Sequence, residues 1–174
     1  MDDALTRHGG RRAHKENGVT WYDAAAGERI AVRVSSHDTN GAYEVVESIA
    51  DPGCCVPLHL HQNEQEHFVV IAGTYRFACQ NKLFDATAGT SVTIPKGTWH
   101  AWRNLSSSPG RLLAAFTPGG FERLIQEVID APAGLRRLRP FRRSRAQQVQ
   151  QDRLSAGDIP AFEIVNWSTK GERS

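Results

Sequence analysis

Short β-branched and aromatic segments, separated by Gly, Pro, Asn and Ser, fill most of the chain between residues 29 and 117 and restrict what it can fold into. At Ile30, Val32 and Val34, apolar residues alternate with other side chains, the period-two pattern of a half-buried strand. Many such strands at close spacing indicate an all-β sandwich or barrel. We predict strands at residues 29–34, 43–50, 66–79 with an interruption at Gly73, 83–87, 91–94, 100–105 and 111–117.

The pattern changes on both sides of this region. Residues 1–27 are polar and show no sustained period, so we predict an irregular N-terminal arm before a barrel at residues 28–118. Residues 119–174 are expected to form a helical extension that packs on the barrel, with a second, weaker helix at 144–154 and an apolar closing segment at 159–167. The first of these helices is indicated by apolar residues at i, i+3, i+4, i+7 and i+8, which are Phe121, Leu124, Ile125, Val128 and Ile129.

Charge and composition are those of an ordinary globular protein and indicate no specific partner. The chain has 174 residues, the usual size of one domain, and a formal net charge of +2, which demands neither nucleic acid nor an anionic membrane. Six arginines between Arg136 and Arg145 form a basic cluster. We interpret it as a solvated face or an oligomer contact in preference to a nucleic-acid site. With neither a signal-like start nor a long apolar run, we expect a cytoplasmic protein.

Histidines provide the first indication of chemistry. His59 and His61 are one residue apart, so on a strand both imidazoles project from the same face and can reach one ion. Such a pair alone is a half-site, and surface or core histidines remain the simpler interpretation without further context. The three cysteines are odd in number and lack a paired C-x-x-C spacing, which indicates buried thiols.

The context resembles the two signature motifs of the cupin superfamily. The resemblance covers residues 53–104, and the segment 117–128 is similar, more loosely, to the helix after the barrel in small quercetin-dioxygenase-like cupins. It implies a double-stranded β-helix barrel of jelly-roll type with a metal held by His59, His61, Glu66 and His100. The two matching patterns are Gly53-x5-His59-x-His61-x4-Glu66-x6-Gly73 and Gly89-x5-Pro95-x-Gly97-x2-His100-x3-Asn104.

Strand alternation assigns the remaining side chains to faces. Phe68 shares the inward face of Glu66, whereas His67 points away, and Trp102 and Asn104 share the face of His100. A β-turn at residues 94–97 is expected to reverse the chain before His100. Further candidates for the pocket are Phe116 and, if the strand phase survives Gly73, Arg76; Glu64 is an alternative to Glu66, and Cys55 has inward parity in a strand that Pro57 interrupts.

Three functions are compatible with this site. The first is a non-haem dioxygenase acting on a small aromatic or enolisable substrate, with Glu66 as ligand and catalytic base. The others are a non-catalytic binding or sensing module, and an isomerase or decarboxylase in which Arg76 meets an anionic substrate. We expect one divalent ion per chain, with iron(II) ranked before manganese, nickel or zinc, and a homodimer that pairs through exposed strand edges.

Overall fold

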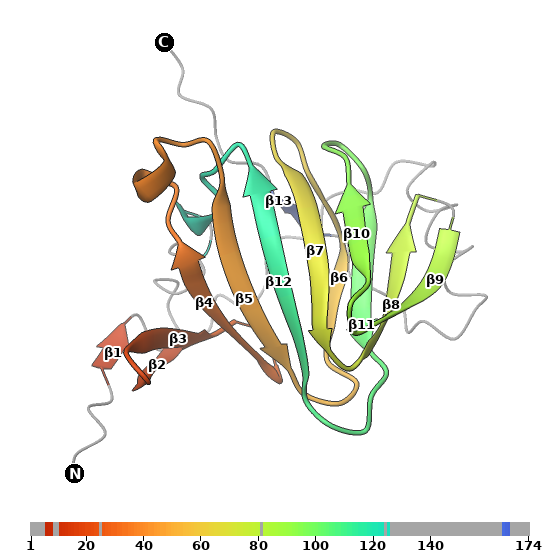
Figure 1. The fold of residues 1–174 in the computed structure, drawn as a ribbon, viewed down its shortest axis with the longest axis horizontal. Coiled ribbons are helices and arrows are strands. Elements are labelled where there is room, and N and C mark those ends of the chain that lie inside the picture. The colour runs from red at the N-terminus through yellow and green to blue at the C-terminus, as the bar shows by residue number, and fades with distance from the viewer. Residues whose placement is uncertain are drawn as a thin grey trace.

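The computed structural model describes residues 6–8, 11–24, 26–80, 82–123, 125 and 165–167. Nearly all of these residues lie in strands or in the turns between them (Figure 1). The elements are β1 (Thr6–His8), β2 (Arg11–Glu16), β3 (Val19–Asp23), β4 (Glu28–Val34), the 3-10 helix η1 (His37–Thr39), β5 (Glu44–Ala50), β6 (Cys55–His61), β7 (Gln65–Ala72), β8 (Thr74–Cys79), β9 (Lys82–Thr87), β10 (Ser91–Ile94), β11 (His100–Asn104), β12 (Gly110–Thr117) and β13 (Val165–Trp167).

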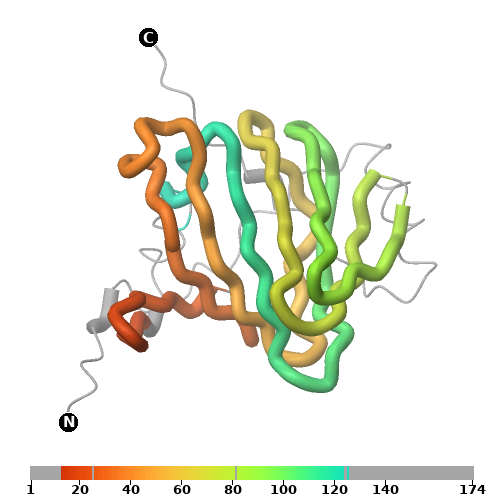
Figure 2. Tube along the Cα trace, in the orientation of Figure 1, coloured from red at the N-terminus to blue at the C-terminus, as the bar shows by residue number. Residues whose placement is uncertain are grey.

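The strands form two facing sheets. One has the order β1-β2-β3-β4-β5-β12-β7-β10 and the other β13-β6-β11-β8-β9. From β5 to β12 the chain passes repeatedly from one sheet to the other through loops at the two ends of the barrel (Figures 1 and 2). This confirms the predicted all-β fold of the double-stranded β-helix type. It also brings the end of β6, the start of β7 and the start of β11 to the same end of the barrel, at the top of Figure 1.

Alternating side chains fill the space between the sheets. Phe77 of β8 lies with its ring centroid 5.2 Å from that of Phe68 on β7, and Tyr75 meets Trp102 of β11 edge to face at 5.5 Å. Each of these side chains is at least 95% buried, and burial of an aromatic ring of this size contributes about 1.5–3 kcal/mol. The opposite face of the five-stranded sheet carries a smaller apolar cluster around Leu58, Ala78 and Ala101.

The N-terminal region differs from the prediction. Instead of an irregular arm, β2 and β3 pair antiparallel and β3 continues the large sheet beside β4. They are joined at Asn17 and Gly18, whose φ angles of 49° and 80° are both positive, as a type I′ hairpin turn requires. The Asn-Gly dipeptide was the sequence signal for this hairpin, and the polar composition of the region obscured it.

The C-terminal predictions are only partly covered by the described residues. The N–H of Ile125 donates to the carbonyl oxygen of Phe121 at 3.2 Å, the first turn of the predicted helix, and the rest of this helix lies outside the described residues. The predicted helix at 144–154 and the basic cluster at 136–145 also lie outside them. Within the closing segment, β13 pairs in parallel with β6 at the edge of the small sheet. In the described part of the chain, no helix has the length and apolar character needed to cross a bilayer.

Candidate metal centre

Three strands from both sheets bring the four predicted ligands together. His59 and His61 lie on β6 and His100 on the neighbouring strand β11, whereas Glu66 lies on β7 of the facing sheet. One potential ligand atom of each residue lies within 4.8 Å of those of the other three. Because metal–ligand bonds are about 2 Å long, atoms on opposite sides of one ion lie about 4 Å apart. The four side chains therefore have the spacing of a single-ion site.

The orientation of the His59 and His100 rings leaves the Nε2 atom of each available to bind a metal ion. Nδ1 of His59 lies 2.7 Å from the carbonyl oxygen of Pro57, and Nδ1 of His100 lies 2.9 Å from that of Thr98. A carbonyl oxygen only accepts, so both Nδ1 atoms donate a proton and both Nε2 atoms keep a lone pair. This is the arrangement by which a backbone carbonyl fixes a metal-ligating histidine.

The Nε2 atoms of His100 and His61 both face the carboxylate of Glu66. Nε2 of His100 lies 2.9 Å from Oε2 of Glu66, a contact that either a proton or a metal ion must bridge. Nε2 of His61 lies 3.3 Å from the same oxygen, is buried and has no hydrogen-bond partner of suitable geometry. A buried nitrogen without a partner requires an explanation, and a divalent ion supplies one. The residues present therefore fit one metal ion.

The surroundings of the site favour a neutral His59 and an ionised Glu66, the protonation states in which these side chains bind a metal ion. Burial, together with the neighbouring His100 and His61, holds the pKa of His59 well below its ordinary value, so that this imidazole is neutral at physiological pH. Burial alone would raise the pKa of Glu66, but the neighbouring imidazoles of His100 and His61 outweigh it and lower this pKa to about 2. Glu66 is therefore an anionic oxygen donor opposite imidazole nitrogens, a set that suits first-row divalent metals.

Pro57 changes the strand parity just before the first histidine. His100 pairs with His59, but Trp102 pairs with Val56, so β6 has one residue more than β11 between these pairs. This bulge turns Cys55 to the outer face, where it packs with the Leu58 cluster. Burial also raises the pKa of the Cys55 thiol, which disfavours the thiolate. The inward parity that the uninterrupted pattern would give Cys55 is thus overturned.

The loop before His100 differs by one residue from the predicted turn. The N–H of Thr98 donates to the carbonyl oxygen of Pro95 at 3.2 Å, so the turn spans residues 95–98 instead of 94–97. Gly97 occupies its third position with φ 72°, a conformation that favours glycine. Its N–H donates to the carbonyl oxygen of His61 at 2.7 Å. The turn therefore ties two metal-binding segments together, as well as reversing the chain.

Other acidic and imidazole groups near the cluster take different roles. His67 lies on the outer face as predicted, where its ring nitrogens contact Thr93 Oγ1 at 3.0 Å and Gln65 Nε2 at 2.7 Å. Glu64 is buried, but among the described residues the group of possible ligand atoms contains Glu66 and not Glu64. The structure thus favours Glu66 over the alternative ligand.

Aromatic rings enclose the cluster on the His61 side. Phe116 of β12 lies with its centroid 5.4 Å from that of His61, and Phe68 lies 6.4 Å from His100, so both rings lie beside the cluster. Phe121 stacks on Phe116 at 4.0 Å and meets the His61 ring edge-on at 5.1 Å. The sequence interpretation placed Phe121 only on the apolar face of a helix. Its position directly after the Pro118-Gly119-Gly120 turn, close to the end of β12, was the available signal.

Three further predicted pocket residues are placed as follows. Trp102 faces inward and packs on Tyr75, one step deeper in the barrel than His100. Asn104 also faces inward, but its amide nitrogen donates to the carbonyl oxygens of Ala50, Asp51 and Ser108 at 2.9–3.3 Å, so it organises loops at the far end instead of lining the pocket. The predicted inward direction of Arg76 is wrong.

Arg76 points outward because the strand phase changes at Gly73. Tyr75 and Phe77 of β8 are in the core, so Arg76 between them lies on the outer face. Its Nε and Nη2 donate to the two carboxylate oxygens of Asp85 on β9 at 2.7 and 2.9 Å. The basic side chain that an anionic substrate would need is therefore not in the barrel interior.

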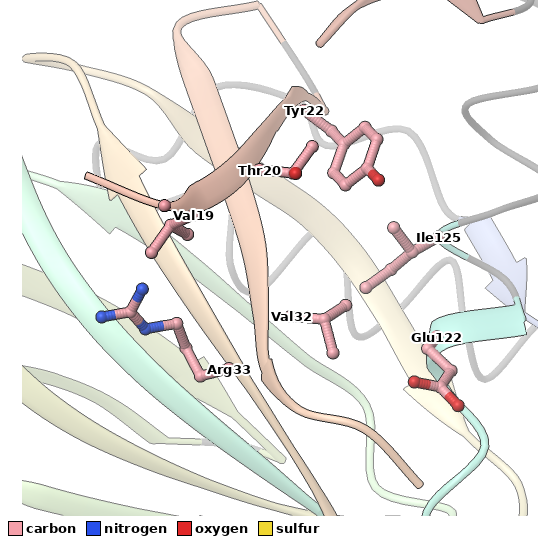
Figure 3. Close-up of a pocket in the computed structure, with 8 residues that line it drawn as sticks. Val19, Thr20, Tyr22, Val32, Arg33, Glu122 and Ile125 are labelled. Carbon is pink, nitrogen blue, oxygen red and sulfur yellow. The ribbon is translucent and has the colours of Figure 1, made fainter. Parts of the chain in front are cut away.

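A cavity of about 500 Å³ lies at the edge of the barrel, between the β3–β4 hairpin and the first helical turn (Figure 3). Val32, Tyr22 and Ile125 form its apolar lining, and Arg33 and Glu122 place charges at it. None of the four metal-cluster residues lines this cavity. Phe121 contacts His61, and Ile125, whose N–H donates to the carbonyl oxygen of Phe121, lines the cavity.

A two-sheet barrel with three histidines and one glutamate gathered at one end is the architecture of metal-binding β-barrel proteins of the jelly-roll type. The family model described as the cupin domain matches residues 46–116, which span most of β5 and β12, the strands β7 and β10, and the whole five-stranded sheet except β13. Residues 46–116 therefore form a cupin domain.

Comparisons with individual proteins agree with this assignment. The chain is 32% identical over 77 residues to the alginate biosynthesis protein AlgA of Pseudomonas syringae, a match that covers 44% of this chain but only 15% of that protein. An RmlC-like cupin from Shewanella frigidimarina is similar in structure with a TM-score of 0.54 and 18% identity, covering 63% of this chain and 92% of the other. A predicted oxalate decarboxylase from Thermotoga maritima has a TM-score of 0.50 and 24% identity, covering 52% and 80%. These structural similarities show the fold alone.

Proposed function

We propose that the cupin domain uses one divalent ion, with iron(II) ranked before manganese, nickel or zinc, to catalyse dioxygenation of a small aromatic or enolisable molecule. The observation that carries this proposal is the cluster of three imidazoles and one carboxylate, in which the buried Nε2 of His61 lacks a hydrogen-bond partner, beside the stacked rings of Phe116 and Phe121. Nitrogen and oxygen donors of this kind suit redox-active first-row metals. The aromatic stack suits a planar, apolar substrate.

The protein side chains divide the chemical work. When bound, the ion supplies Lewis acidity and coordination positions that the protein does not fill. Glu66 would accept the proton of a substrate hydroxyl or enol, because it is the anionic side chain of the cluster. The rings of Phe68, Phe116 and Phe121 lie beside the cluster and keep bulk water from it. Both oxygen atoms of O2 enter the product, so the reaction needs no external reductant.

Oxygen uptake tests the proposal directly. Iron(II)-loaded protein is incubated anaerobically with a flavonoid, a catechol or a β-diketone, air-saturated buffer is added, and O2 consumption and product mass are recorded. We expect uptake of one O2 per substrate, and products whose summed composition is that of the substrate plus two oxygen atoms, with at least one of these compounds. The matched control is His100→Ala, which removes an imidazole of the cluster. No uptake with any compound, or equal uptake by His100→Ala, would contradict the proposal.

A second candidate is a binding or sensing module without turnover. The observation that favours it is burial, since the four cluster residues are at most 5% exposed and Phe121 packs over His61. Such closure suits a site that retains its ligand. A small molecule that co-purifies with the metal-loaded protein and is recovered chemically intact after prolonged aerobic incubation would support this candidate over the dioxygenase.

A further inference from the structure

Glu44 lies at the metal-binding end of the barrel, although it is not one of the clustered ligands. In the strand register, Glu44 of β5 is directly opposite Phe116 of β12, and Phe116 is directly opposite Glu66 of β7. Residues directly opposite each other project from the same face of a sheet. With neighbouring strands about 4.8 Å apart, the backbones of Glu44 and Glu66 are separated by about 10 Å. Both carboxylates therefore belong to one row on the wall of the barrel.

The Glu44 side chain is only half satisfied. It is fully buried, and its Oε2 accepts the N–H of Gly120 at 2.8 Å, but its Oε1 is buried without any hydrogen-bond partner. Burial raises the pKa of this carboxyl and the nearby Glu122 and Glu64 charges add to the effect, whereas the backbone N–H groups of Gly120 and Glu122 lower it. Leaving a buried carboxylate oxygen unpaired is unfavourable, which points to a partner that arrives from outside the chain.

Charges in the barrel interior are of one sign among the described residues. The buried charged side chains there are glutamates, and no Lys or Arg of the described part of the chain is buried. The one buried glutamate of the outer face, Glu47, is paired with Arg33 and Arg111. An anion in the pocket would thus meet Glu44 without a compensating cationic side chain from these residues.

We propose that Oε1 of Glu44 accepts a hydrogen bond from a hydroxyl or ammonium group of the molecule that binds at the metal cluster. The site then takes a neutral or cationic molecule that carries such a donor about one aromatic ring away from its metal-binding atom. It discriminates against small dianions such as oxalate. This inference rests on the proposed function only in that the molecule binds at the metal cluster; it does not require turnover.

Azide binding measures the charge of Glu44 without knowledge of the substrate. Cobalt(II)-loaded wild type is compared at pH 8.5 with Glu44→Gln and with Glu47→Gln, a matched control on the same strand but the opposite face. Azide binding is followed by the cobalt absorption spectrum. A charge about 10 Å away changes anion affinity by about tenfold, so azide should bind about tenfold tighter to Glu44→Gln and equally to Glu47→Gln. Equal azide affinity in wild type and Glu44→Gln would overturn the proposal.

A second arm tests recognition of a donor. We expect 1,2,4-trihydroxybenzene, whose 4-hydroxyl lies across the ring from a metal-binding oxygen, to bind cobalt(II)-loaded wild type more tightly than oxalate does. Glu44→Gln should weaken binding of this triol about tenfold while strengthening oxalate. Glu44→Asp, which keeps the charge but shortens the side chain, should weaken the triol without changing azide affinity. Tighter binding of oxalate than of the triol by wild type, or unchanged triol affinity in Glu44→Gln, would overturn the inference.

The outcomes separate this inference from the proposed function. Cobalt content and thermal unfolding are recorded for every variant, because Glu44 is expected to affect neither metal occupancy nor folding substantially. Ligand binding that depends on Glu44 without oxygen uptake leaves the inference intact and contradicts the dioxygenase. Oxygen uptake that Glu44→Gln leaves unchanged supports the dioxygenase and contradicts this inference. Failure of wild type to bind cobalt overturns both.

Discussion

Glu28, a buried carboxyl inside the barrel, should make the protein less stable as the pH rises. Its Oε1 accepts the Ser48 hydroxyl at 2.7 Å, but burial outweighs this hydrogen bond and raises its pKa from 4.5 to about 7. Between these two values the folded state holds a proton that the unfolded state has released, so stability falls with pH across this window. A shift of this size corresponds to about 3 kcal/mol.

The substitution Glu28→Gln tests this reasoning, since it keeps the shape and an acceptor for Ser48 but cannot ionise. Denaturant unfolding is measured from pH 4 to pH 8.5 with a chelator present, which removes the contribution of metal binding. Glu28→Gln should match wild type near pH 4 and exceed its free energy of unfolding by about 3 kcal/mol above pH 7. Ser48→Ala, which removes the pKa-lowering bond, should extend the wild-type loss of stability to higher pH. A Glu28→Gln effect that is independent of pH would refute the reasoning.

Three further substitutions give separate results. Asn104→Ala leaves backbone carbonyl groups at the far end of the barrel without their donor, and should lower the free energy of unfolding by about 1–3 kcal/mol in denaturant titrations with unchanged metal content. Gly110→Ala would place a Cβ 2.5 Å from Oη of Tyr75, so it should lower the melting temperature by an amount equivalent to about 1–3 kcal/mol, and an unchanged value would contradict the packing described. Phe121→Ala uncovers the His61 ring and should accelerate removal of the metal by a chelator; an unchanged rate would show that this ring does not limit access.

The metal cluster could be predicted from sequence because its four residues stand at positions of two motifs that resemble those of cupins. His59 and His61 share a face through the two-residue period of a strand, and the turn before His100 is marked by proline and glycine. Glu66 faced inward for the same reason. Where a bulge interrupted the strand, as at Pro57, the period no longer applied to the residue before it, and Cys55 faced outward.

The errors arose where the chain passes between sheets. At Gly73, with φ 90°, the chain leaves β7 in one sheet and enters β8 in the other, so the inward phase moves by one residue and Arg76 faces solvent. The proximity of Phe121 to His61 and of Glu44 to the site depends on which strands are neighbours in space. Such neighbours follow from the topology, and the local pattern of a segment does not contain them.

The central claim is that the three histidines and Glu66 hold one metal ion, and elemental analysis of the purified protein tests it most directly. Wild type should contain about one equivalent of a first-row divalent metal per chain. His59→Ala and His100→Ala should each lose it while retaining the β-rich circular dichroism spectrum of wild type, and Glu64→Gln should keep it. Wild type that remains metal-free after incubation with iron(II), manganese, nickel and zinc, or full occupancy in both histidine variants, would contradict the account.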